Sequence, residues 1–118
     1  MDEEKALEFT QASAAVMELV FRSKGRFRNS EIECLTVVHD HTLGELRYFA
    51  PISRTDFLRE TGLSQPSVTT ALGRLLAAGV VIRFRTDGRG KRVNAGPPPF
   101  VYKIDLAAVR RLLHRDAA

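Results

Sequence analysis

The sequence has very little cysteine, since Cys34 is the only one among its 118 residues. A single thiol excludes an intrachain disulfide and any metal site made of cysteines alone. Long apolar runs are also missing: no stretch reaches the eighteen or so residues that a transmembrane helix needs. The chain opens Met-Asp-Glu-Glu, which is acidic where a secretory signal would be basic. We therefore expect a cytoplasmic protein with no membrane partner.

Signatures of catalysis are equally scarce. No Gly-x-Ser-x-Gly elbow occurs, and the serines fall mainly where helices are expected to begin. The segment Asp87-Gly-Arg-Gly has the glycines of a phosphate loop, but no helix is expected to follow it. The sequence predicts neither an enzyme nor a bound cofactor.

A metal site can be considered around His39, Asp40 and His41, which lie near Cys34 and could be joined by His114. Such a cluster would suit a metal or redox sensor. Its spacing matches no recognised zinc site, and the two neighbouring histidines would face different sides of a helix. A buried thiol with polar residues at a helix end explains the pattern more simply, so we expect no metal.

Basic residues are what the chain has in excess. There are 18 Lys and Arg against 14 Asp and Glu, which gives a net charge of +4 and a pI near 9.7. Such a balance is one part of the electrostatic pattern of nucleic-acid binding. The length and the absence of repeats or linkers indicate one domain over residues 1–118.

The N-terminal part is expected to be helical. Residues 3–22 contain no Gly or Pro, and their apolar residues cover much of the helix circumference. This breadth predicts a dimerisation helix at 1–22, although a helix that crosses the domain's own core would show the same pattern. The basic segment 22–28 is either a solvated loop or an extension of a DNA-binding surface. Ser30 and Glu33 match a capping box for a second helix that ends near His39.

Residues 53–104 carry the most informative pattern. Ser53 and Asp56 form a second capping-box candidate, and Gly62 suits the left-handed position after a short helix. Ser64 is expected to cap the next helix, at about 64–78. Two short helices joined by such a turn form a helix-turn-helix, and a short extended piece is expected before them, at 48–52.

A hairpin is expected after the helix-turn-helix. Residues 80–86 alternate and are rich in β-branched side chains, and 100–104 form a second strand. Between them, 87–99 are predicted to be irregular, which makes 83–100 a basic wing. Asp105 is expected to cap a final helix at 105–118, with an apolar stripe on one side. The predicted fold is mainly α with a small β-hairpin wing (α+β): a winged helix-turn-helix with additional terminal helices for dimerisation.

The outer face of the 64–78 helix is small and polar, with one Arg and no acid. Small side chains let a helix lie close to base edges in the major groove, where Gln and Arg can form paired hydrogen bonds with adenine and guanine.

The segment GLSQPSVTTALGRLLAAGVV (62–81) resembles the recognition-helix segment of the MarR and TrmB families of prokaryotic regulators. Asp87-Gly-Arg89 and the basic residues after it are similar to the MarR wing, in which an Asp braces the wing Arg. GPPPFVYKI (96–104) looks more like the second wing strand of TrmB-like proteins. The resemblance covers about half of the chain, and it implies a homodimer joined by terminal helices.

The resemblance and the residue pattern together imply three kinds of DNA contact. Base contacts would come from the recognition helix, phosphate contacts from helix N-termini, and backbone or minor-groove contacts from the wing. The predicted residues are, in that order, Gln65, Ser67, Thr69, Thr70 and Arg74; Ser53, Arg54 and Ser64; and Arg89, Lys91 and Arg92.

The predicted function is a sequence-specific regulator that binds double-stranded DNA as a homodimer on an inverted repeat. A small-molecule effector is left open. Two alternatives stay open as well: a protein-interaction module of a larger assembly, and a non-specific DNA-coating protein.

Overall fold

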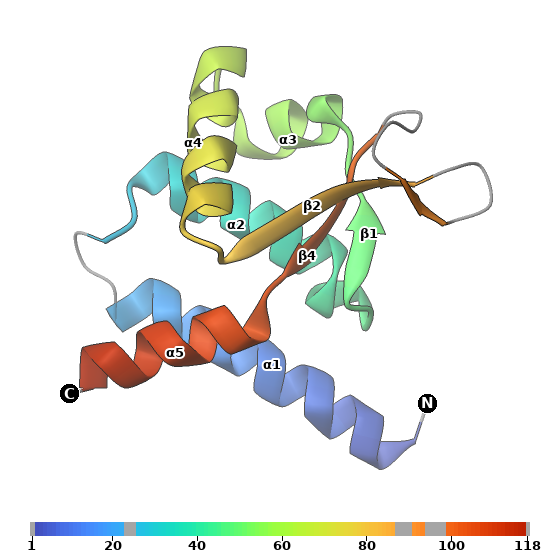
Figure 1. The fold of residues 1–118 in the computed structure, drawn as a ribbon, viewed down its shortest axis with the longest axis vertical. Helices are drawn as coiled ribbons and strands as arrows, with labels where there is room; N and C mark the ends of the chain where they lie inside the picture. Colours follow the sequence, from blue (N-terminus) through green and yellow to red (C-terminus); the bar gives the residue numbers. More distant parts are fainter. Residues whose placement is uncertain (1, 23–25, 87–90, 94–98, 118) are drawn as a thin grey trace.

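The computed structural model describes residues 2–22, 26–86, 91–93 and 99–117 (Figure 1). Its helices pack on both sides of a central helix, α2, and a small antiparallel sheet lies beside them. In chain order the elements are α1 (Glu3–Arg22), α2 (Asn29–His41), the 3-10 helix η1 (Leu43–Glu45), β1 (Phe49–Pro51), α3 (Arg54–Thr61), α4 (Gln65–Ala77), β2 (Val81–Thr86), β3 (Arg92–Val93), β4 (Val101–Ile104) and α5 (Leu106–Ala117). None of the helices in these described residues could cross a membrane.

The sheet has the strand order β1-β4-β2-β3, with antiparallel pairing throughout. The extended piece predicted at 48–52 is β1, on one edge, and the hairpin of 80–86 with 100–104 is β2 paired with β4. The prediction that 87–99 are wholly irregular was wrong, because β3 pairs with the end of β2. The pairing of β4 with β2 reaches only as far as Phe84, so β3 supplies the partner that the last two residues of β2 need.

The start of α2 also differs from the prediction. The helix begins at Asn29 after an extended Arg28, and no side chain caps it, so Ser30 is not the N-cap. The backbone N–H of Ile32 already donates to the Arg28 carbonyl at 3.0 Å. Phe27 and Ile32 both belong to the core, and they occupy the two positions of a hydrophobic staple, which accounts for the earlier start.

The terminal helices α1 and α5 pack against each other along one end of the molecule (Figure 1). Val16 and Leu19 of α1 and Val109 of α5 are fully buried. One face of α1 therefore crosses the domain's own core, as the alternative interpretation predicted. Its other face leaves Leu7 and Phe21 exposed.

Candidate nucleic-acid interface

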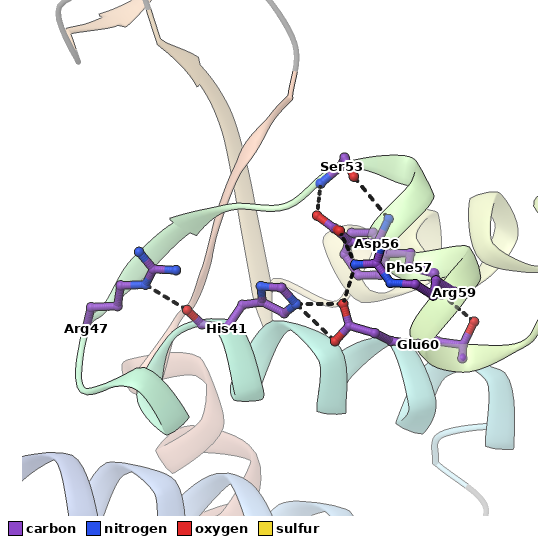
Figure 2. Close-up of polar contacts among 8 residues, drawn as sticks. His41, Arg47, Ser53, Asp56, Phe57, Arg59 and Glu60 are labelled. Carbon is purple, nitrogen blue, oxygen red and sulfur yellow. Dashed lines mark hydrogen bonds and ion pairs between the residues drawn. The ribbon is translucent and has the colours of Figure 1, made fainter.

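The turn between α3 and α4 is fixed by hydrogen bonds at both helix starts. Ser53 Oγ accepts from the backbone N–H of Asp56, and Asp56 Oδ2 accepts from the backbone N–H of Ser53, each at 3.0 Å (Figure 2). Hydrogen bonding of the Asp56 carboxyl with the Ser53 backbone N–H and, next, the Ser53 side chain, with a smaller contribution from Arg59, lowers the pKa of this carboxyl. Gly62 ends α3 with φ of 71°, and Ser64 Oγ then accepts from the Ser67 N–H at 3.3 Å. The predicted capping box, left-handed glycine and second cap are confirmed.

The recognition-helix candidate α4 has one buried face and one exposed face. Val68, Ala71, Leu72 and Leu75 are buried in the core. The predicted base-contacting residues lie outside this buried face. Ser67 is half-buried, and the others are exposed: Gln65, Thr69, Thr70 and Arg74. The structure therefore brings the predicted base-contacting set together on one surface.

Thr69 is held by a residue of the preceding helix. Arg54 Nη1 donates a hydrogen bond to Thr69 Oγ1 at 2.6 Å, and both side chains are exposed. The sequence predicts separate roles for these two residues, one on phosphate and one on bases. The structure links them into a single unit at the junction of α3 and α4.

Arg74 also has a partner that the sequence analysis missed. Its Nη1 atom lies 3.5 Å from Glu31 Oε2, on α2. The Glu31 side chain is only 7% exposed, whereas that of Arg74 is 44% exposed. No spacing within α4 could reveal this carboxylate, because it lies 43 residues away in the sequence.

A groove of about 280 Å³ runs between the start of α2 and α4. It is lined by residues from both helices and from the segment before α2: Arg28, Ser30, Glu31, Pro66, Ser67, Thr70, Ala71 and Arg74. Four of these eight residues belong to α4 and are not buried: Pro66, Ser67, Thr70 and Arg74. The groove therefore lies along the same surface as the predicted base contacts.

The wing is organised around two aromatic rings. The guanidinium carbons of Arg83 and Arg85 lie 4.3 and 4.1 Å from the ring centre of Phe100, and that of Arg92 lies 4.9 Å from the ring centre of Phe84. Cation–π contacts of this kind orient arginines without neutralising them. Neither phenylalanine is among the site residues predicted from the sequence.

Two of the three predicted wing contacts lie within the described residues. Lys91 and Arg92 are both exposed, which suits contact with a large anionic partner. Arg89 and Asp87 lie outside the described residues, so the predicted brace between them stays a prediction.

The histidine cluster is divided among different neighbours. His39 Nε2 lies 2.6 Å from Ser13 Oγ on α1, and its Nδ1 lies 2.9 Å from Asp40 Oδ1. His41 turns to the other side, where its Nε2 lies 2.8 Å from Glu60 Oε2 on α3 (Figure 2). Across the described ranges, no three His, Cys, Asp or Glu side chains are grouped so as to hold a metal ion.

The one thiol is equally unsuited to sensing. Cys34 is fully buried, and burial together with the nearby Glu33 raises its pKa to about 11. A thiol with so high a pKa is a poor nucleophile, because the thiolate is the reactive form. Cys34 therefore acts as a small apolar core residue.

Comparison with known proteins gives one match. Residues 35–92, just under half of the chain, match the sequence model of the MarR family. This region runs from α2 through the helix-turn-helix to the start of β3, and with the observed elements it establishes the winged-helix fold of that family. No curated protein and no solved structure matches the chain. The TrmB likeness of residues 96–104 stays a prediction.

Proposed function

We propose that this chain is a MarR-family transcription regulator that binds double-stranded DNA in a sequence-specific manner, and that it is not an enzyme. The family match implies a DNA-binding regulator at the coarser level. The observation that carries the finer proposal is the exposed face of α4, which combines small polar residues with a firmly capped start. We infer that this helix enters the major groove, where one α-helix fits.

Base contacts are assigned to the exposed side of α4, which also carries Arg74. Gln65, Thr69 and Thr70 are exposed there, and Ser67 faces the adjoining groove. Gln can bond adenine through two atoms, and the methyl groups of threonines can touch thymine. Desolvating these neutral side chains against base edges costs less free energy than desolvating charged side chains.

Phosphate contacts are assigned to Arg54 and the wing. Arg54 uses one nitrogen on Thr69, which leaves other N–H donors of its guanidinium for a phosphate. Ser53 and Ser64 are engaged in capping, so we expect their contribution to come mainly from fixing the helix starts. Lys91, Arg92 and Arg89 complete the set, since a basic wing can follow the backbone or enter a narrow minor groove.

A homodimer is proposed through the exposed face of α1. Leu7, Ala14 and Phe21 are exposed and recur every seven residues, so they lie along one stripe of the helix. A second copy of the chain would bury this stripe, and a two-fold dimer would favour an inverted repeat in DNA. The cytoplasm is the proposed location, and a small-molecule effector stays open.

The test is selection from a pool of random duplexes, followed by sequencing, at about physiological salt. Enrichment of an inverted repeat would support a dimeric, sequence-specific regulator. Binding without enrichment would favour a non-specific DNA-coating protein, and no binding by the folded protein would favour a protein-interaction module.

A pair of lysine variants separates wing contact from general charge. Lys91→Ala should weaken binding to all duplexes alike and reduce the slope of log K against log salt by about 1. Lys5→Ala removes the same charge from the exposed start of α1 and should leave the slope unchanged. Equal slopes for the two variants would contradict the wing contact.

A further inference from the structure

Glu31 is an unusual residue for the edge of a DNA-binding surface. It lies in the first turn of α2, its side chain is 7% exposed, and it lines the groove beside α4. A buried carboxylate is unfavourable unless a charge or hydrogen-bond donor compensates it. Arg74 is the ion-pair partner, at 3.5 Å, and it reaches across from α4.

We propose that Glu31 is a positioning residue, which sets the orientation of Arg74 on the recognition helix and thereby contributes to the choice of DNA sequence. This inference rests on the proposed function. It adds a residue from outside the helix-turn-helix to the determinants of specificity.

The physical basis is the length and freedom of the arginine side chain. An exposed arginine samples many rotamers, and ordering it on binding opposes affinity. The contact with Glu31 engages Nη1 before DNA arrives, and the guanidinium keeps other N–H donors available. The 44% exposure of Arg74 leaves that group accessible from solvent.

The pair also restricts where Arg74 can go. If the guanidinium left Glu31 to reach a distant base, the buried carboxylate would lose this ion pair, which is unfavourable. Arg74 is therefore expected to contact DNA from the α2 side of α4, beside Ser67 and Thr70, which line the same groove. DNA sequences with a hydrogen-bond acceptor on the base that faces this side of α4 are therefore favoured over sequences without one.

The experiment compares Glu31→Gln with Glu33→Gln, in the full chain. Glu33 is an exposed glutamate on the same helix, so its substitution controls for the loss of one negative charge near DNA. The probes are the duplex enriched by the unmodified protein and a scrambled duplex of equal length. The measured quantity is the dissociation constant for the scrambled duplex divided by that for the enriched duplex. Thermal unfolding of each variant is recorded alongside.

We expect Glu31→Gln to lower this ratio about threefold or more, as for residues coupled by direct contact. Glu33→Gln should change both dissociation constants in parallel and leave their ratio unchanged. In an Arg74→Ala background, Glu31→Gln should have no further effect on the ratio. A role in stability alone would lower the unfolding temperature without this dependence on Arg74.

Two outcomes would overturn the inference: an unchanged ratio in Glu31→Gln, or an equal fall with and without Arg74. Absence of any sequence preference in the unmodified protein would instead overturn the proposed function itself, and the inference with it. If Glu31→Gln does not fold, Glu31→Asp keeps the charge, shortens its reach and supports the same comparison.

Discussion

Removing the Ser53 hydroxyl tests the local geometry that presents α4. In Ser53→Ala the backbone N–H of Asp56 loses its acceptor, whereas the reciprocal bond from the Ser53 N–H to the Asp56 carboxylate can persist. Loss of an N-cap serine typically lowers the free energy of unfolding by about 1 kcal/mol, within about 0.5–2. Ser53 is half-buried, so water can replace the lost acceptor only in part. We therefore expect a loss near the middle of this range.

This energy can be converted into a melting temperature. Unfolding entropies of about 2.1 cal/mol/K per residue give about 0.25 kcal/mol/K for a chain of this length, so a loss of about 1 kcal/mol lowers Tm by about 4 °C. Thermal unfolding followed by circular dichroism resolves such a shift.

Ser30→Ala is the matched control, because the sequence predicts a capping role for Ser30 that the structure does not give it. The start of α2 has no side-chain cap, so this substitution should change the free energy of unfolding by no more than about 0.5 kcal/mol. Equal losses for the two alanine variants, or no loss for Ser53→Ala, would refute the assignment of the caps. Ser53→Asp keeps an acceptor at the cap and should retain most of the stability.

Three further predictions concern ionisation, reactivity and packing. The pKa of the Asp56 carboxyl is lowered in the folded protein, so its contribution to stability is present above the unfolded pKa of about 3.9 and is lost as pH falls through the lower folded pKa. Asp56→Asn should flatten the curve of stability against pH in that range, and an unchanged curve would exclude this linkage. Cys34, buried and with a pKa near 11, should resist a thiol reagent at pH 8 until the protein unfolds, so immediate labelling of the folded protein would contradict its place in the core. Leu19→Ala should lower the free energy of unfolding by about 2–5 kcal/mol. Phe21→Ala, at a side chain 75% exposed, should change the free energy of unfolding little but weaken the proposed dimer in sedimentation measurements. Similar effects of both variants would count against two distinct faces of α1.

The features that could be predicted from the sequence are those whose determinants lie within a few residues of one another. The cap at Ser53, the left-handed Gly62 and the cap at Ser64 each depend on a local hydrogen bond or a backbone angle. The alternation in 80–86 likewise predicts a strand from its own side chains, and β2 forms there. The start of α2 was mispredicted because the side-chain pattern at Ser30 competes with burial of Phe27, and burial depends on the whole core.

The short strand β3 was missed for a similar reason. Its two residues have no strand pattern of their own, and they pair with the end of β2, beyond the last β2 residue that pairs with β4. The stacking of Arg83 and Arg85 on Phe100 depends on the pairing of β2 with β4, because Phe100 directly precedes β4. Long-range pairing of this kind leaves no periodic signal in a single sequence.

The charge of the candidate interface likewise could not be predicted from the residues of α4 alone. Along α4 alone the outer face carries one arginine and no acid, and this predicts a free cation for DNA. The folded protein places Glu31 against that arginine, so the local charge of the pair is close to zero and Arg74 acts as an oriented donor. In the proposed binding mode, attraction to DNA would come mainly from Arg54 and the basic wing, while α4 would supply hydrogen bonds and methyl contacts. Because attraction and discrimination depend on different elements, substitutions in the wing should change the salt dependence of binding, and substitutions on α4 should change sequence preference.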